Sequence, residues 1–388
     1  MNVQLAEGHP DSSPTQLASR LGSIIVLLFA FLLGVKGIGD GFRLLGGDVL
    51  EGFFSATANP FIGLMAGILA TTLVQSSSVT TSMIVGFVAA PENPLPLANA
   101  VPMVMGANIG TTVTNTIVSL AHMTRPDEFR RAFAVATCHD FFNYMSVAIL
   151  LPLELATGFL QRTATMLAEP LVGVGGVTYQ SPLRGALNWG FTPIRGLAEL
   201  LFERERGQAI VLIALSALLI FVALAALVRV MRSIMQSRVE KFVSGVLGSN
   251  AVLSILVGII VTVMVQSSSI TTSLLVPLAG AGLLTLEAAF PITLGANVGT
   301  TVTALMASLA VSGPNAAAGI EIGLVHLLFN VTGTLLIYPA PAIRRIPLGA
   351  ARSLAAHAVR SRKLALLYVV VLFYGVPAML VVLGRLLN

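Results

Sequence analysis

A polar octapeptide that occurs twice in apolar surroundings constrains this chain more than any other feature. Its first copy, Gln-Ser-Ser-Ser-Val-Thr-Thr-Ser, runs from Gln75 to Ser82, and a near-identical copy runs from Gln266 to Ser273, 191 residues later. Hydroxyl and amide groups are expensive at hydrocarbon depth unless they bind a ligand or one another. The duplication therefore predicts two related halves that bring matching polar surfaces together.

The composition is typical of an integral membrane protein. Hydrophobic residues make up 55% and charged residues 10% of the 388 residues, which excludes an ordinary soluble domain. Apolar stretches near the length that crosses a bilayer, about 20 residues, recur along the chain. Continuous candidates are 21–39, 208–228, 317–340 and 364–386, and interrupted ones are 58–90, 99–122, 130–152, 251–280 and 286–310. The predicted fold class is an all-α integral membrane protein.

The net charge of +5 is concentrated in short connectors. Basic residues gather at 125–131, 229–241 and 344–363, a distribution typical of cytoplasmic loops. This pattern argues against nucleic acid as a partner, and we expect the lipid bilayer to surround the chain. The single cysteine, Cys138, excludes an internal disulfide, and its position within a span favours a packing role.

Two further matches follow the octapeptides in the same order. The motif Gly-Ala-Asn-(Ile/Val)-Gly-Thr-Thr-Val-Thr, here called the second phrase in both of its copies because it follows the octapeptide, begins at Gly106 and again at Gly295. A His-x-x-x-Asn pattern begins at His139 and again at His326. Offsets of 191, 189 and 187 residues indicate an internal duplication. An odd number of crossings in each half predicts opposite orientations, which is the inverted-repeat plan of secondary transporters.

Each octapeptide lies in the middle of an apolar stretch whose two arms are too short for two crossings. We therefore predict a re-entrant helical hairpin in each half, with the polar motif at its tip, where protein or water must surround the non-helical backbone. The segments Asn108-Ile-Gly110 and Asn297-Val-Gly299 predict broken helices. Glycine relaxes the backbone there, and the threonines that follow can satisfy the freed groups.

Six parts are predicted along the chain. They are a polar N-terminus (1–20), transport repeat 1 (21–152), an extramembrane loop with one amphipathic helix (153–206), transport repeat 2 (207–340), a basic cytoplasmic connector (341–363) and a terminal transmembrane helix (364–388). The N-terminus lacks the layout of a cleaved signal, so the first span is expected to be retained. Residues 40–57 are interpreted as interfacial; if they cross, the hairpins open to the opposite sides.

Three consecutive serines that open a helix are suited to binding an anion. They place hydroxyls and unpaired N–H groups at the positive end of the helix dipole. The serines in this position are Ser76, Ser77, Ser78, Ser267, Ser268 and Ser269. Two such tips can hold a tetrahedral oxyanion from opposite sides. Small residues in spans also serve close helix packing, and this alternative is strongest for the second phrase.

An anion at bilayer depth must be neutralised, yet no lysine or arginine lies near either octapeptide or either Gly-Ala-Asn phrase. Co-bound cations are therefore expected, which makes anion–cation symport a hypothesis from electrostatics. Amide and hydroxyl oxygens suit a hard monovalent cation. Asp140, an acidic residue well inside its span, is a predicted cation ligand, with a proton relay through His139 and structural pairing as alternatives. A hydrogen-bonded core role is favoured for His139 and His326.

These motifs resemble those of the type II sodium–phosphate cotransporter family. The two Gln-Ser-Ser-Ser motifs are that family's signature, and the stretch from Met105 to Glu154, with Phe-Arg-Arg-Ala-Phe-Ala and His-Asp-Phe-Phe-Asn, is especially similar. The resemblance covers about 20–340. It implies a secondary active symporter that couples Na⁺ entry to phosphate uptake by alternating access, without a cofactor. It also implies a compact member of a bacterial inner membrane that lacks the accessory domain of some relatives.

The resemblance further implies roles for individual residues. The six serines would contact phosphate, and Asp140 with Asn143 would form the additional sodium site of electrogenic members. By resemblance, Gln75, Gln266, Thr300 and Thr303 would also contribute sodium ligands. Together with hydroxyls and amides of the Gly-Ala-Asn motifs, the complete set of predicted sodium-binding residues is Gln75, Gln266, Thr111, Thr112, Thr300, Thr303, Asn108, Asn297, Asp140 and Asn143. His122 and Arg125 stand where vertebrate members are expected to carry Gln and Asp, which leaves the geometry of that additional site open.

Rival functions remain at this point. Serine and backbone donors recognise a tetrahedral shape and not its central atom, so arsenate and sulfate are alternative substrates. A passive channel is another alternative. An intramembrane serine hydrolase is a rival from another class, but no Gly-x-Ser-x-Gly motif surrounds these serines, and we expect no enzyme activity. The sequence leaves the oligomeric state open, with a homodimer as one alternative.

Overall fold

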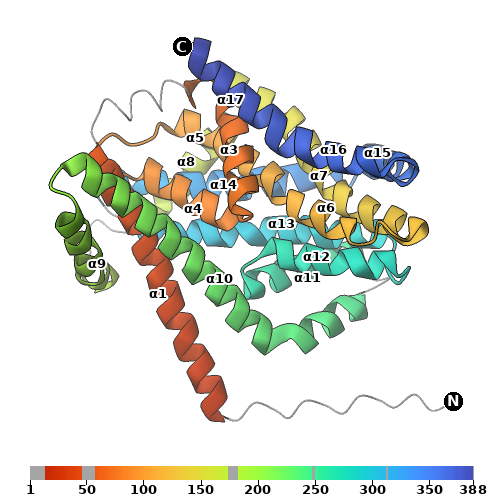
Figure 1. The fold of residues 1–388 in the computed structure, drawn as a ribbon, viewed down its shortest axis with the longest axis horizontal. Coiled ribbons are helices and arrows are strands. Elements are labelled where there is room, and N and C mark those ends of the chain that lie inside the picture. Colours follow the sequence, from red (N-terminus) through yellow and green to blue (C-terminus); the bar gives the residue numbers. More distant parts are fainter. Residues whose placement is uncertain (1–13, 46–56, 174–181, 247–249, 312, 388) are drawn as a thin grey trace.

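Most of the residues that the structure describes lie in helices. The computed structural model describes residues 14–45, 57–173, 182–246, 250–311 and 313–387, and these ranges contain no strand (Figure 1). The prediction of an all-α fold is confirmed. The first 13 residues of the predicted polar N-terminus, and residues 46–56 of the segment interpreted as interfacial, lie outside the described residues.

The helices of the first part of the chain are α1 (Pro14–Leu45), α3 (Pro60–Val74), α4 (Ser77–Val88), α5 (Leu97–Thr111), α6 (Val113–Leu120), α7 (Pro126–Thr157), α8 (Phe159–Gly173) and α9 (Pro182–Leu201). Those of the second part are α10 (Glu205–Val246), α11 (Ala251–Val265), α12 (Ser268–Gly280), α13 (Leu286–Ser308), α14 (Ala316–Ile337), α15 (Pro341–Arg360), α16 (Arg362–Val369), the π-helical turn η1 (Val370–Gly375) and α17 (Val376–Leu387).

Five of the described helices are long and apolar enough to cross a bilayer. They are Pro126–Thr157, Glu205–Ala223, Leu286–Ser308, Ala316–Ile337 and Arg362–Gly384. The hairpin arms are shorter: α3 and α4 have 15 and 12 residues, and α11 and α12 have 15 and 13. A crossing needs about 20 residues, so each arm is too short to cross the bilayer, as the sequence predicts. The re-entrant course of the hairpins stays a prediction.

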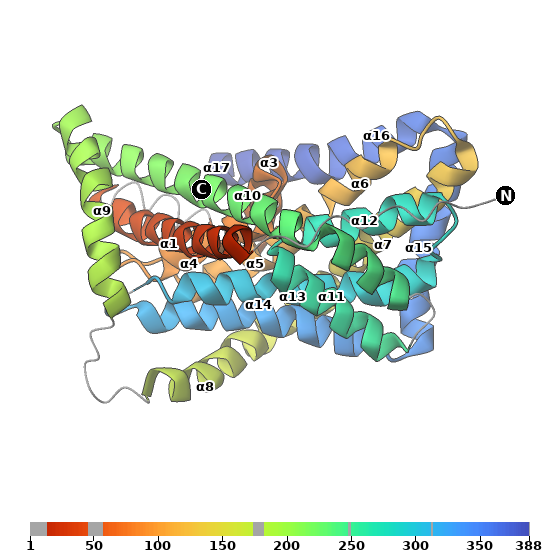
Figure 2. The same cartoon turned by 90° about the horizontal axis from the view of Figure 1, so that it is seen from below.

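The helix packing of the first half recurs in the second. Helix α3 packs against α5 as α11 packs against α13, and α4 contacts α14 as α12 contacts α7. Helix α8 packs against α14, and α15 packs against α7 (Figure 2). The first helices of the two halves, α1 and α10, lie side by side along much of their length (Figure 1). Each half therefore packs a hairpin arm against a long helix of the other.

Direct backbone contact between helices explains the glycines of the second phrase. A Cβ atom added to Gly295 of α13 would lie 2.0 Å from the carbonyl oxygen of Ile255 in α11. In the first half, a Cβ atom added to Gly106 of α5 would likewise lie 2.0 Å from the carbonyl oxygen of Leu64 in α3. Only glycine allows two helices to approach this closely.

The prediction that both Asn-x-Gly segments unwind is wrong. Helix α13 runs without interruption from Leu286 to Ser308. In the first half the interruption between α5 and α6 is confined to Thr112, whose φ of −73° and ψ of −21° remain right-handed helical. The glycines serve close packing here, because each faces the backbone of a neighbouring helix. The neighbouring threonine hydroxyls bond carbonyl groups of their own helices.

The segment 153–206 is more helical than the sequence predicts. A loop with one amphipathic helix is expected there, whereas the structure has the end of α7 followed by α8 and α9. Gly158 turns the chain between α7 and α8 with a φ of 64°. The carboxylate of Glu154 accepts hydrogen bonds from the N–H groups of Leu160 (2.5 Å) and Gln161 (3.2 Å), which caps the start of α8. The predicted extramembrane position of this segment stays a prediction.

Candidate functional site

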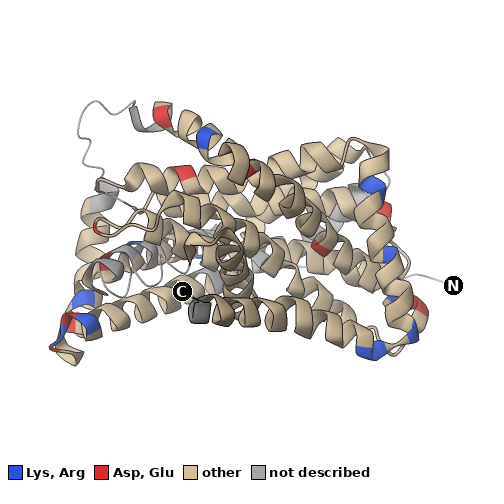
Figure 3. Cartoon of the chain, turned by 90° about the horizontal axis from the view of Figure 1, so that it is seen from above, with Lys and Arg blue, Asp and Glu red and all other residues tan. Residues whose placement is uncertain are grey.

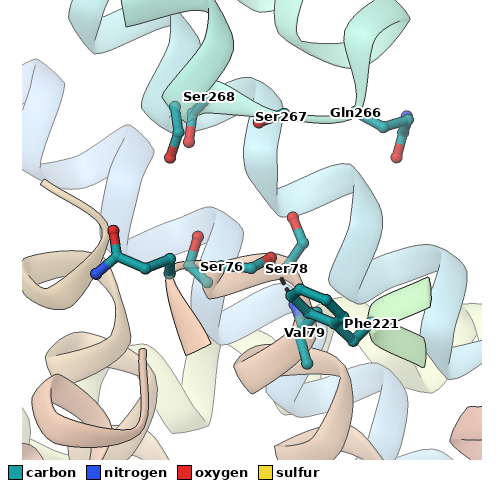
Figure 4. A pocket seen from close by; sticks show the side chains of 10 residues that line it. Ser76, Ser78, Val79, Phe221, Gln266, Ser267 and Ser268 are labelled. Carbon is teal, nitrogen blue, oxygen red and sulfur yellow. Dashed lines mark hydrogen bonds between the residues drawn. The ribbon is translucent and has the colours of Figure 1, made fainter. Parts of the chain in front are cut away.

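The two octapeptides meet at one pocket, here called the serine pocket. Its volume is about 180 Å³. Figure 4 shows Ser267 and Ser268 of the α11–α12 hairpin opposite Ser76 and Ser78 of the α3–α4 hairpin, with Phe221 of α10 at one side. The lining residues are Gln75, Ser76, Ser77, Ser78, Val79, Phe221, Gln266, Ser267, Ser268 and Ser269. The structure therefore brings together all six serines that were predicted to contact an anion.

Each hairpin tip has the same backbone turn. Gln75 and Gln266 end the first arm in the left-handed conformation, with φ of 57° and 56°. Ser76 and Ser267 follow in extended conformation, and each hydroxyl oxygen accepts a hydrogen bond from the N–H group three residues ahead, at 3.3 and 3.4 Å. The dipeptide Gln-Ser thus ends one helix and caps the next, which explains why it recurs at both tips.

Helix ends of both polarities converge on the serine pocket. Helices α4 and α12 begin at Ser77 and Ser268, and the first-turn N–H groups of a helix have no partner within it. Helices α3 and α11 end immediately before the glutamines, with their carbonyl groups at that end. None of the described residues that line the pocket is charged. The pocket can therefore offer positive dipole ends to an anion and carbonyl oxygens to a cation.

A chain of hydrogen bonds links the two tips. Ser78 Oγ donates to Thr303 Oγ1 at 3.4 Å, and Thr303 Oγ1 donates to Gln266 Oε1 at 3.1 Å. In the first half, Thr114 Oγ1 donates to Gln75 Oε1 at 3.0 Å. Each glutamine oxygen is therefore oriented by a threonine of the second phrase, and neutral oxygens cluster beside the serines.

A second polar cluster, the asparagine–histidine cluster, lies among α5, α7, α13 and α14. Its six buried side chains are those of Asn108, His139, Asn143, Asn297, His326 and Asn330. His139 Nε2 lies 3.0 Å from Asn297 Oδ1, and His326 Nε2 lies 3.3 Å from Asn108 Oδ1. Each histidine thus bonds the asparagine of the other half. The hydrogen-bonded core role expected for both histidines is confirmed.

The asparagines of this cluster also bond across the halves. Asn297 Nδ2 donates to Asn143 Oδ1 at 2.8 Å, and Asn330 Nδ2 donates to Asn108 Oδ1 at 3.1 Å. Asn143 Nδ2 donates in turn to the carbonyl oxygen of Asn108 at 2.9 Å. Buried amides without such partners would be costly, so these bonds fix the contact between the halves. None of the six side chains lines the serine pocket.

Asp140 is buried in α7 and has hydrogen-bond partners on one oxygen. Its Oδ2 accepts from Tyr368 Oη at 2.8 Å and from Thr116 Oγ1 at 3.2 Å. Its Oδ1 has no partner among the described residues. A buried carboxylate oxygen without a partner is costly, and a cation beside it would remove that cost. The described residues hold no group of three or more His, Cys, Asp or Glu, so neutral oxygens would have to complete such a site.

The predicted sodium-binding residues therefore fall into separate places. Gln75 and Gln266 line the serine pocket, and Thr303 adjoins it through Gln266. Asn108, Asn143 and Asn297 belong to the asparagine–histidine cluster, and Asp140 has its own partners. The remaining three, Thr111, Thr112 and Thr300, donate their hydroxyls to carbonyl groups of their own helical segments at 3.0, 2.8 and 3.0 Å and do not line the pocket.

Comparison with known proteins places this architecture in a family. A model of the Na⁺/Pi-cotransporter family matches residues 30–179 and 218–380. The chain belongs to the Na⁺/Pi-cotransporter family. Both hairpins, the asparagine–histidine cluster and Asp140 lie within the matched ranges. Family membership and the five apolar helices together make the chain an all-α membrane protein.

Members of the Na⁺/Pi-cotransporter family from animals are similar over most of this chain. It is 31% identical to the human sodium-dependent phosphate transport protein 2B over 92% of its own length and 64% of the human protein. It is 31% identical to protein 2A of Rattus norvegicus, over 97% of this chain and 70% of the rat protein. The chain thus spans about two thirds of the length of these relatives. No solved structure matches it.

Sequence reasoning about this Na⁺/Pi-cotransporter family member missed four side chains. Thr114 could have been found, because it occupies in the first half the position of Thr303 in the second. Asn115 accepts hydrogen bonds from Thr272 and Ser273 of the second hairpin at 2.9 and 3.1 Å. Phe221 and Tyr368 come from helices outside the motifs, so only the tertiary fold could show them.

Proposed function

We propose that the protein is a secondary active symporter that couples Na⁺ entry to uptake of inorganic phosphate. The observation that carries this proposal is the serine pocket, in which two matching tips meet and no described lining residue is charged. The relatives named as sodium-dependent phosphate transport proteins support it. The volume of about 180 Å³ is well above the roughly 10–15 Å³ that a cavity needs to hold one water molecule, so the pocket has room for a ligand larger than water.

The phosphate would lie between the two tips. Ser76, Ser77 and Ser78 on one side and Ser267, Ser268 and Ser269 on the other offer hydroxyl donors at the starts of α4 and α12. Helix N-termini stabilise anions through their free N–H groups and their dipole. Two opposed tips match a tetrahedral anion better than one, because its oxygens point in opposite directions.

Sodium would be required because the pocket has no fixed positive charge. A phosphate brought to this depth without a counter-charge would carry the full cost of desolvation. Gln75, Gln266 and Thr303 provide neutral oxygens beside the serines, which suit Na⁺. Binding of Na⁺ would therefore precede or accompany phosphate, and neither charge would enter easily alone. Obligatory coupling follows from this electrostatic requirement.

A further sodium ion would bind at Asp140. Its unpartnered Oδ1 supports this assignment, since the oxygen is buried and belongs to a carboxyl group. Asn143 lies one turn further along α7. The remaining proposed sodium-binding residues are Asn108, Asn297, Thr111, Thr112 and Thr300. A single carboxylate with neutral oxygens matches a monovalent ion better than Ca²⁺ or a transition metal.

Alternating access would use two inverted-topology repeats, 21–152 and 207–340, each with a re-entrant hairpin. The recurrent helix packing and the matching hairpin turns support this arrangement. The segments 153–206 and 341–363 would lie outside the membrane core, with the second on the cytoplasmic side, and 364–388 would form a terminal span. The proposed location is a bacterial inner membrane, with the two halves rocking about the serine pocket.

Uptake of radiolabelled phosphate into proteoliposomes tests this function. We expect saturable uptake that depends on an inward Na⁺ gradient, and no uptake by Ser77→Ala or Ser268→Ala. Ser254→Ala is the matched control, because Ser254 lies on α11 outside the pocket. Uptake without Na⁺ would refute the coupling, and wild-type uptake by either tip variant would refute the site. Arsenate and sulfate as competitors would identify another tetrahedral oxyanion as the substrate.

A further inference from the structure

A second pocket, here called the arginine pocket, lies at the end of the molecule formed by α15. It is enclosed by the start of α7, the connection between α12 and α13, and the middle of α15. Figure 3 shows Lys and Arg gathered at this end. Its volume is about 530 Å³, roughly three times the 180 Å³ of the serine pocket, and the two pockets share no lining residue.

The lining combines three guanidinium groups with an apolar wall. Arg130 and Arg131 come from α7 and Arg352 from α15. The wall is formed by Ala134, Val135, Leu284, Leu286, Ala355 and Ala356. No acidic residue is among the described lining residues. A cavity of this kind has one charged end for an anion and a larger apolar surface for a hydrocarbon chain.

The three arginines differ in how far they are already engaged. Arg131 donates to the carbonyl oxygens of Ala279 (3.1 Å) and Gly280 (2.6 and 3.1 Å) at the end of α12, which uses two of its three nitrogens. Arg352 forms an ion pair with Glu287. Arg130 has neither an ion pair nor a side-chain hydrogen bond in the described part of the chain. At least one guanidinium is therefore available to an anionic ligand.

The surroundings favour an amphiphile over a small soluble anion. Leu283, beside the pocket, is 67% exposed, and Ile346 on α15 is 60% exposed. Large apolar side chains next to arginines are typical of the membrane–water interface, where acyl chains meet headgroups. The volume of about 530 Å³ is also about three times that of the serine pocket, which is proposed to hold one phosphate. Basic pockets between helices at such an interface hold anionic lipid headgroups.

We propose that the arginine pocket binds an anionic phospholipid. Its phosphate group contacts Arg130, with the spare donors of Arg131 and Arg352 within the same cavity, and an acyl chain lies along Leu284 and Leu286. Guanidinium and phosphate pair through two parallel hydrogen bonds, which gives the contact its specificity.

The bound lipid would connect the two halves. Arg130 and Arg131 belong to α7 of the first half, whereas the α12–α13 connection and α15 belong to the second part of the chain. Arg131 also holds the end of the hairpin arm that carries Ser268. Occupation of this pocket therefore stabilises the contact between α7 and the second hairpin, at a site separate from the transported ions.

Lipid binding to the purified full chain in a neutral detergent tests this proposal. Phosphatidylglycerol, phosphatidylcholine and inorganic phosphate are titrated separately, and lipid retention is measured by native mass spectrometry. We expect phosphatidylglycerol to bind and phosphatidylcholine to bind at least about fivefold more weakly, since one basic residue near an anionic lipid contributes that factor. Arg130→Gln should weaken phosphatidylglycerol binding by a similar factor.

Two further variants make the result specific to the pocket. Arg345→Gln removes a charge from an exposed position of α15 that does not line the pocket, and it should leave lipid binding unchanged. Ala356→Trp fills the pocket without altering charge and should weaken binding. Equal effects of Arg130→Gln and Arg345→Gln, equal binding of the two lipids, or displacement of the lipid by inorganic phosphate would each overturn the proposal. None of these measurements depends on transport activity.

Discussion

Gly295→Ala tests the close contact between α11 and α13. The added Cβ atom would lie 2.0 Å from the carbonyl oxygen of Ile255, whereas ordinary van der Waals contact begins at 3.4 Å. The two helices must therefore separate by about 1.4 Å at this point, because both atoms belong to backbone or are fixed to it. Gly106→Ala makes the equivalent change between α5 and α3, with the same distance to Leu64.

The expected change in the free energy of unfolding has two contributions of opposite sign. Replacing a helical glycine with alanine gains about 1 kcal/mol of helix propensity. Overpacking in a dense interior costs about 1–3 kcal/mol. A net loss of up to about 2 kcal/mol is expected. The effect on function should be larger, since α13 also carries Thr303, which orients Gln266 at the serine pocket. A misplacement of about 1 Å can reduce a rate by about 100-fold.

Phosphate uptake and thermal unfolding in detergent measure the two effects. We expect Gly295→Ala and Gly106→Ala to lower the unfolding temperature slightly and uptake strongly. Gly349→Ala on α15 is the matched control, because nothing lies within 4 Å of its added Cβ atom, and it should keep full uptake. Wild-type uptake and stability in Gly295→Ala would show that the helices are not in backbone contact, and the packing explanation of the second phrase would be refuted.

Two other changes test the buried polar groups. Asp140→Asn replaces the carboxyl group that contains the unpartnered Oδ1 with a neutral amide. The charge moved per transported phosphate should then fall in electrical recordings on membranes that contain the protein, and unchanged currents would make Asp140 structural. Asn297→Leu leaves His139 Nε2 and Asn143 Oδ1 without their partner, so the free energy of unfolding should fall by about 1–3 kcal/mol. An unchanged midpoint of thermal unfolding would contradict the role given to these hydrogen bonds between the halves.

The helix positions and the hairpin tips were predictable from the sequence because the information for them is local. Apolar length locates the spans, and the repeated Gln-Ser dipeptide marks the point where one helix ends and another begins. The convergence of the two serine triplets also followed from the duplication, since matching polar segments in an apolar chain need a common polar environment.

Other features depended on contacts that no local pattern contains. The Asn-x-Gly segments are equally compatible with an unwound helix and with close packing, and the nearby backbone of another helix decides between them. Tyr368 reaches Asp140 from a helix more than 200 residues away in sequence, so nothing near either residue indicates the contact.

The exchange of hydrogen bonds within the asparagine–histidine cluster limits how such a chain can arise and fold. In each half the Nε2 atom of the histidine has its partner in the other half, because His139 bonds Asn297 and His326 bonds Asn108. A protein of half this length could bury the same groups only by pairing with a second copy of itself. Fusion of two such copies would keep those bonds and remove the dependence on concentration, and the fused chain must complete both halves before its centre is stable.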